Sequence, residues 1–149
     1  MLEDTIINDL AQKIKISRDR LAVEAWEIIF LKELFQSSFA KHLIFKGGTA
    51  LRLAYMSPRF SEDLDFSLRK KISEKEFKNC FDKILKKYPK ISITDIKEKY
   101  YTLFALIKIK EPFLKLPFSI KIEVSKRIAP KNYESMPKIL SSPVTSLEV

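Results

Sequence analysis

The chain has 149 residues and carries 28 lysines and arginines against 19 aspartates and glutamates, a formal net charge of +9. Hydrophobic residues make up 46 % and charged residues 32 %, a mixture that can bury a core and argues against intrinsic disorder. No apolar run approaches the roughly 20 residues that a membrane span needs, and the acidic start lacks a signal-peptide pattern. The one cysteine, Cys80, cannot form an internal disulfide, so we expect a cytoplasmic protein with a single domain over residues 1–149 and no membrane partner.

The positive charge indicates a class of binding partner, and the scarcity of histidine excludes some kinds of catalytic site. An excess of positive charge favours polyanionic partners, nucleic acid above all, although a lysine-rich proteome produces the same balance. His42 is the one histidine in the sequence, which excludes a zinc site or a mechanism built on two histidines of this chain. His42 directly precedes the apolar run at residues 43–45, and we interpret it as a residue at the edge of that segment rather than as a general base.

The first 38 residues favour two helices. Residues 4–16 show a weak helical pattern of apolar positions. Ser17 can cap a second helix that starts at Arg18 and ends near Ser38. The broad apolar face of this helix indicates that it is well buried, and Arg20 and Glu24 are expected to pair on its wetter side.

The next segment predicts a strand, a turn, a short helix and a second strand. A short apolar strand at residues 43–45 leads to Gly47 and Gly48, after which a helix runs from Thr49 to about Tyr55. Residues 57–62 are expected to form a loop. The alternation of polar and apolar residues over 63–68 is typical of a strand.

The rest of the chain favours one helix followed by strands. Ser73 and Glu76 form a capping box for a helix that Pro89 stops. Residues 91–96, 101–110 and 118–125 are predicted strands, and a loop-like tail follows from residue 129. This order predicts an α+β fold, with N-terminal helices packed on a mixed β-sheet.

The only two glycines of the sequence, Gly47 and Gly48, are adjacent and stand between a strand and a helix. Glycine permits positive φ angles and lets a ligand approach the backbone closely. A helix N-terminus behind it offers free N–H groups and the positive end of a dipole, which suits phosphate. Thr49 would add its hydroxyl and its N–H. A bare tight turn is the alternative explanation of this pair.

Three carboxylates stand at strand positions that suit metal binding. Asp63 and Asp65 are two residues apart, so on a strand they point to the same side. Neighbouring carboxylates repel unless a cation or proton intervenes, and hard oxygen ligands suit Mg²⁺ or Mn²⁺. Glu123 shares one face of a later strand with Lys121, and it completes a three-acid cluster if that strand pairs beside the Asp63 strand. Solvated strand faces are the alternative.

Two sequence blocks resemble the AbiEii/AbiGii-type nucleotidyltransferases of the DNA polymerase β-like superfamily. They are FKGGTALRL at residues 45–53 and RFSEDLDF at residues 59–66. The resemblance is strong over residues 42–68 and weaker over 118–127, where Glu123 falls at the third-acid position. It implies a nucleotidyltransferase-type mixed sheet.

The resemblance also implies roles for these residues. Gly47, Gly48 and Thr49, with the adjacent Lys46, would bind the triphosphate of a nucleoside triphosphate substrate. Asp63, Asp65 and Glu123 would hold Mg²⁺ or Mn²⁺, with Glu123 helping to activate the acceptor hydroxyl. Arg59 and Ser61 would hold their loop or touch phosphate.

The same resemblance implies binding partners and a C-terminal region that this chain is expected to lack. Family members include toxins of toxin–antitoxin and phage-defence systems, some of which modify tRNA ends, so RNA and an antitoxin protein are the expected partners. Full-length relatives continue into a C-terminal helical region, which we expect this chain to lack. Full activity is then expected to need that region, and the uncovered surface to favour self-association.

Two other readings compete with this one. The segment from Asp63 to Ser67 superficially resembles the D-x-D-x-T/S motif of haloacid-dehalogenase-like phosphatases. In those enzymes the acids follow a hydrophobic strand, whereas here they precede the apolar residues. The stronger alternative is a truncated remnant of the nucleotidyltransferase family that binds nucleotide or RNA and has weak catalytic activity.

Overall fold

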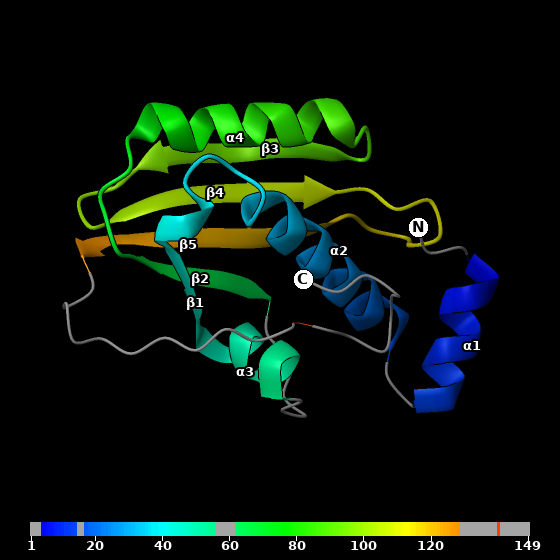
Figure 1. The fold of residues 1–149 in the computed structure, drawn as a ribbon. Helices are drawn as coiled ribbons and strands as arrows, with labels where there is room; N and C mark the ends of the chain where they lie inside the picture. The colour runs from blue at the N-terminus through cyan, green and yellow to red at the C-terminus, as the bar shows by residue number, and fades with distance from the viewer. Residues whose placement is uncertain (1–3, 15–16, 56–61, 129–139, 141–149) are drawn as a thin grey trace.

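The structure is a computed structural model that describes residues 4–14, 17–55, 62–128 and 140. It has the α+β organisation expected from the sequence (Figure 1). In chain order the elements are α1 (Asp4–Ile14), α2 (Arg18–Leu34), the short 3₁₀ helix η1 (Ala40–His42), β1 (Leu43–Lys46), α3 (Gly47–Tyr55), β2 (Asp63–Leu68), α4 (Glu74–Lys87), β3 (Ile91–Glu98), β4 (Thr102–Ile109) and β5 (Phe118–Ile128). The expected loop at 57–62 lies outside the described residues except for Glu62, which is in a bend, and the tail from 129 lies outside them except for Leu140.

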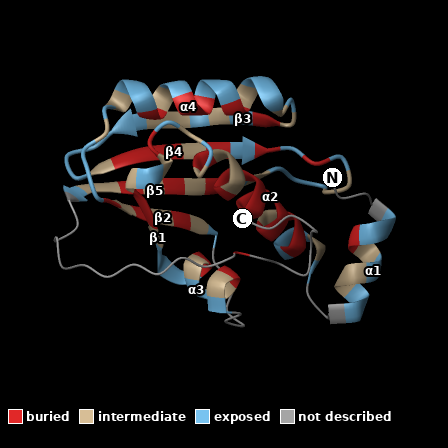
Figure 2. Cartoon of the chain, in the orientation of Figure 1, coloured by how far each residue is buried: buried red, intermediate tan, exposed pale blue. Residues whose placement is uncertain are grey.

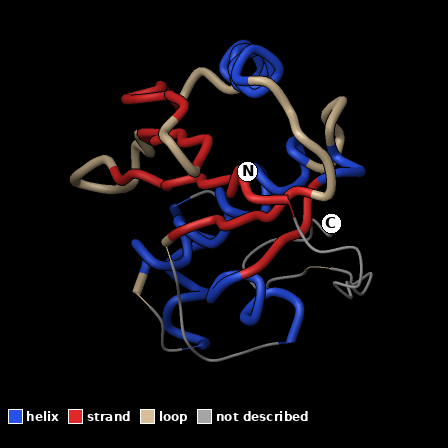
Figure 3. Tube along the Cα trace, turned by 90° about the vertical axis from the view of Figure 1, so that its left-hand side faces the viewer, coloured by secondary structure: helices blue, strands red, loops and turns tan. Residues whose placement is uncertain are grey.

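The five described strands form one mixed sheet in the order β1-β2-β5-β4-β3. Only the central β2–β5 pair is parallel, and the other three pairs are antiparallel. The last described strand, β5, is therefore inserted between β2 and β4, which brings residues more than fifty positions apart into direct register. In the view turned by 90°, α4 lies at the top of the strand layer, close to β3 (Figure 3).

Local sequence signals set the helix starts. The Ser17 hydroxyl accepts a hydrogen bond from the Arg20 N–H, and the Ser73 hydroxyl accepts one from the Glu76 N–H, as the capping patterns predict. Helix α2 ends at Leu34 rather than near residue 38. The Ser37 hydroxyl donates to the Leu34 carbonyl (2.6 Å), and the following backbone N–H groups bond three residues back, which tightens and ends the helix.

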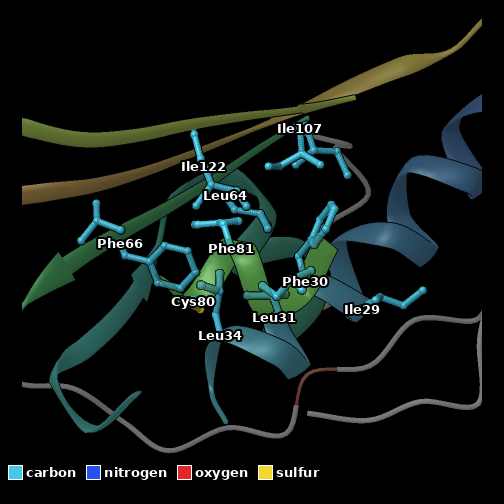
Figure 4. Close-up of a cluster of buried hydrophobic side chains, with 14 of the residues drawn as sticks. Ile29, Phe30, Leu31, Leu34, Leu64, Phe66, Cys80, Phe81, Ile107 and Ile122 are labelled. Carbon is cyan, nitrogen blue, oxygen red and sulfur yellow. The ribbon is translucent and has the colours of Figure 1, made fainter. Parts of the chain in front are cut away.

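The main core lies between one face of the sheet and helices α2 and α4 (Figure 4). Alternation along β2 sends Leu64, Phe66 and Leu68 into this core, and all three are almost fully buried. Figure 2 shows buried residues concentrated in α2 and along the strands. The strands therefore turn their alternate, more polar positions to the opposite face, which we call the site face.

A buried polar contact joins α2 to the segment after β4. The Trp26 Nε1–H donates to Glu111 Oε1 (2.8 Å), and the Lys90 ammonium reaches Glu111 Oε2 (2.9 Å). Glu111 is only 3 % exposed, so its carboxylate depends on these two donors for the solvation it has lost.

We predict that Trp26→Phe lowers the free energy of unfolding by about 1–3 kcal/mol, because it leaves a buried carboxylate oxygen without its donor. Urea denaturation measures the change. Lys87→Gln serves as the control, since Lys87 is exposed and its ion pair with Glu33 should contribute less than about 1 kcal/mol. Equal destabilisation by the two variants would contradict the assignment.

Candidate active site

The candidate acids come together through the parallel pairing of β2 with β5. In this register Asp65 stands opposite Glu123, and Asp63 stands opposite Lys121. Residues paired across neighbouring strands share a face of the sheet, and the buried Leu64 points the other way. The condition that β5 lie beside β2 is thus met, and all three acids project from the site face.

The acids repel one another, and a lysine offsets part of that repulsion. Burial raises the pKa of Asp65, and the charges of Asp63 and Glu123 raise it further, while Lys121 and Lys46 act against them. The Lys121 ammonium lies 3.6 Å from Asp63 Oδ2 and 3.4 Å from Glu123 Oε1. The same two carboxylates raise the pKa of Lys121. A cation is therefore already the preferred neighbour of these oxygens.

The donor set suits a hard divalent cation, although the side chains are not gathered around one point. Within the described residues, no group of three or more histidine, cysteine, aspartate or glutamate side chains is close enough together to hold a metal ion. The carboxylates are nevertheless of the type that Mg²⁺ and Mn²⁺ prefer, they share one face, and the Lys121 ammonium lies between two of them. Metal binding would require that ammonium to move aside.

Gly47 connects the turn to the acids. Its φ angle is +88°, a conformation that L residues rarely adopt, and a Cβ added to it would lie 2.9 Å from Asp65 Oδ2. Lys46, just before it, pairs with Asp65 across β1 and β2. The absence of a side chain at Gly47 thus lets the first turn of α3, with its unpaired N–H groups, lie against the Asp65 carboxylate.

Thr49 has a different role from the one expected for its hydroxyl. The side chain is buried at 3 % exposure, and its Oγ1 donates to the backbone carbonyl of Asp63 at 2.6 Å. The hydroxyl therefore attaches α3 to the first residue of β2 instead of facing a ligand. The backbone N–H of Thr49 is the group that remains suitable for an anion.

Glu27 of α2 lies beneath this turn. Burial raises its pKa to about 9, the charges of Glu24 and Asp63 add to the shift, and a hydrogen bond with Thr49 and the charge of Arg52 oppose it. Glu27 is thus protonated at neutral pH. Glu27 of α2 therefore lies against Thr49, the residue whose hydroxyl attaches α3 to β2.

Glu24 and Arg52 form a second link between α2 and α3. The Arg52 Nε and Nη2 groups both reach the Glu24 carboxylate, the second at 3.4 Å, so the pair is bidentate. The expectation that Glu24 lies on the wet side of α2 is wrong, because it is 1 % exposed. The presence of Glu24 and Glu27 within an almost continuous apolar run was the available signal that both are buried.

Two further candidate residues, Arg59 and Ser61, lie outside the described residues. Lys46 and Gly48 are exposed at the end of β1 and the start of α3, where an anion could reach them. The described part of the site therefore consists of a glycine turn at a helix N-terminus, facing a row of acids on the adjacent strands.

Comparison with known proteins identifies this arrangement first as a nucleotidyltransferase fold. The chain is similar to two Helicobacter pylori structures, a candidate nucleotidyltransferase (30 % identity, TM-score 0.59, 78 % of this chain and 49 % of that one) and JHP933 (31 % identity, TM-score 0.59, 78 % and 47 %). MenT4, a nucleotidyltransferase toxin from Mycobacterium tuberculosis, shares the fold at 19 % identity (TM-score 0.62, 86 % of this chain and 45 % of that one).

The family follows from a sequence model. The model described as "Nucleotidyl transferase AbiEii toxin, Type IV TA system" matches residues 29–147, so the chain belongs to the AbiEii nucleotidyltransferase toxin family. The chain spans about half the length of the solved structures that it matches. No curated protein matches it. No described helix is long and apolar enough to cross a membrane.

We predict that Gly47→Ala lowers the free energy of unfolding by about 1–2 kcal/mol, the usual cost of a left-handed conformation for an L residue, and that it displaces the Asp65 carboxylate. Gly48→Ala is the control, because Gly47 is the one described glycine with a positive φ. Urea denaturation of both variants checks this. A Gly47→Ala chain as stable as Gly48→Ala would show that the close approach is not required.

We also predict a pH dependence that arises from Glu27. In the unfolded chain its pKa is near 4.5, whereas in the folded chain it is about 9. The folded state binds more protons between these values, so the contribution of Glu27 to stability is complete below about pH 4.5 and is lost as the pH rises toward 9. Glu27→Gln should remove this part of the decline, and its stability relative to wild type should rise between pH 5 and 9.

Glu33→Gln is the matched control on the same helix. Burial raises the pKa of Glu33, but hydrogen bonds from Lys87 and Tyr88 outweigh burial, and the pKa is lowered overall. Its effect on stability therefore falls in the acid range, and its variant should keep the wild-type slope between pH 5 and 9. Parallel slopes for wild type and Glu27→Gln in denaturation measured across this range would contradict the burial of a protonated Glu27.

Proposed function

We propose that the chain is the metal-dependent nucleotidyltransferase core of an AbiEii-type toxin, which transfers a nucleotide from a nucleoside triphosphate to an RNA acceptor. The observation that carries the proposal is the meeting of Asp65 with both Gly47 and Glu123. A phosphate-binding turn and a carboxylate pair on the adjacent strands are the two halves that such a transfer needs.

The candidate residues would bind the triphosphate, hold the metal and accept a proton. The N–H groups of Gly47, Gly48 and Thr49 and the ammonium of Lys46 would hold the triphosphate at the start of α3. Asp63, Asp65 and Glu123 would hold Mg²⁺ or Mn²⁺, which when bound would neutralise charge on the phosphates. Glu123 would also accept the proton of the acceptor hydroxyl, whose oxygen then bonds to the α-phosphorus as pyrophosphate leaves. Arg59 and Ser61 are proposed to support the phosphate side.

The family supports a cellular setting for this activity. Its description as a type IV toxin–antitoxin system supports a role as a toxin, countered by an antitoxin. The net charge of +9 supports an acceptor that is itself a polyanion, such as tRNA.

We further propose that this chain alone is a weak transferase, because it spans about half the length of its structural relatives. Positioning of reactants can account for about 7–11 kcal/mol of a barrier, so a chain that binds a nucleotide without holding its acceptor in line would react slowly.

We predict that Asp65→Asn abolishes the dependence of triphosphate binding on Mg²⁺. The substitution keeps the size of the side chain and removes its charge, so binding in Mg²⁺ should weaken at least about tenfold, equivalent to about 1.4 kcal/mol. Isothermal titration calorimetry with each of the four nucleoside triphosphates, in Mg²⁺ and in a chelator, measures this. Asp82→Asn, an exposed carboxylate of α4, is the control.

The outcomes separate the parts of the proposal. Equal binding by the wild-type chain with and without Mg²⁺ would count against the metal role of the acids, and no binding of any triphosphate would remove the nucleotide site. Nucleotide binding without incorporation into bulk RNA would favour a binding remnant. Robust incorporation by this chain would show that the core is sufficient.

A further inference from the structure

The turn between β3 and β4 carries two exposed tyrosines. The Lys99 N–H bonds to the Thr102 carbonyl (2.7 Å) and the Thr102 N–H bonds back (3.3 Å), which closes a two-residue turn of Tyr100 and Tyr101. Such turns favour glycine and asparagine. Here the side chains are 83 % and 53 % exposed, and neither belongs to the described core clusters. Neither turn geometry nor core packing explains two aromatic residues at this place.

Cations lie over the aromatic rings around this turn. The Lys99 ammonium is 4.1 Å from the centroid of the Phe104 ring, and the Arg127 guanidinium carbon is 4.6 Å from that of Tyr101. The Lys97 ammonium also lies over the Phe104 ring, 5.7 Å from its centroid. The nearby carboxylates are already paired, Asp95 with Lys97 and Glu98 with Lys126. The two exposed tyrosine rings therefore lie among an excess of positive charge, whereas the Phe104 ring, 8 % exposed, is the buried surface over which the lysines lie.

This surface is continuous with the candidate active site. Phe104 pairs directly with Glu123 across β4 and β5, so its ring lies on the site face next to the third acid. The Lys126 N–H bonds to the Tyr101 carbonyl (2.7 Å), which carries the pairing of β5 up to the turn. Figure 1 shows the β3–β4 turn and the C-terminal end of β5 at the same end of the sheet. At about 3.3 Å per residue, the turn lies roughly 10 Å from Phe104 along β4.

We propose that Lys97, Lys99, Tyr100, Tyr101 and Arg127, which we call the aromatic–basic patch, bind a single-stranded stretch of the RNA acceptor beside its reacting end. The proposal rests on the function proposed above and names the surface that recognises the acceptor. Bases stack on aromatic rings with little dependence on sequence, at about 1–3 kcal/mol per base, while lysine and arginine bind the phosphates. A duplex hides its base faces and would not use the tyrosines.

The test is fluorescence anisotropy with a labelled single-stranded RNA of about 12 nucleotides, a length within known site sizes, titrated at several salt concentrations. Tyr100→Ala should weaken binding by about 5-fold to 150-fold through the lost stacking, and Tyr100→Phe should restore it. Lys99→Gln should lower the slope of log affinity against log salt by about 0.7. An unlabelled duplex RNA should compete poorly.

Matched controls lie away from the patch. Leu116→Ala removes an equally exposed apolar side chain, at 78 % exposure, from the β4–β5 connection. Lys83→Gln removes an exposed lysine from α4. Both variants should bind RNA as the wild type does. Wild-type affinity in Tyr100→Ala, equal loss in the controls, equal competition by duplex, or no RNA binding by the wild-type chain would each overturn the patch.

Asp65→Asn separates this proposal from the proposed function. It should lose Mg²⁺-dependent triphosphate binding and keep its affinity for RNA, whereas Tyr100→Ala should do the reverse. RNA binding that maps to the patch in a chain without triphosphate binding would support the surface and refute the transferase site. Triphosphate binding with no effect of the patch variants would refute the surface alone.

Discussion

The hydrogen bond from Thr49 to the Asp63 carbonyl, with Glu27 beneath it, fixes the relation between the turn and the acids. The turn belongs to α3 and the acids belong to β2 and β5, so their separation depends on how α3 is held. Thr49 attaches α3 to β2, and the Glu24–Arg52 pair attaches it to α2. Because both glutamates are buried, a lost partner leaves an uncompensated polar group, which for a buried ion pair costs about 3–5 kcal/mol. The position of α3 is therefore tightly determined.

Carboxyl groups lie close together both around Thr49 and across β2 and β5, and the fold offsets their repulsion in two different ways. On the core side of the turn, Glu27 avoids a buried charge by remaining protonated. On the site face, where solvent reaches the side chains, Asp63 and Glu123 keep Lys121 between them. A buried carboxyl avoids the cost of a desolvated charge by remaining protonated. The acids on the site face keep Lys121 as their counterion, and its charge offsets part of their repulsion.

The sequence predicted the parts of the site that follow from local periodicity. The two-residue spacing of Asp63 and Asp65 and the alternation around Glu123 were sufficient to place each on a strand face. It could not predict that β5 is inserted beside β2, because strand order depends on packing of the whole chain. The burial of Glu24 was missed for a similar reason: its partner, Arg52, is 28 residues away, whereas Arg20 is one helical turn away and suggested a surface pair.

The alternation of the strands also decides which residues can change without loss of the fold. One face of β2 and β5 contributes Leu64, Phe66, Ile122 and Val124 to the core. The residues between them include the candidate acids, and Phe104 of β4 lies further along that opposite face. The core residues and the candidate acids thus lie on opposite faces of the same strands. No such separation exists where α2 meets α3. There the groups that hold the helix in place are also the groups that aim the glycine turn, so a change at Thr49 or Glu27 should affect stability and ligand binding together.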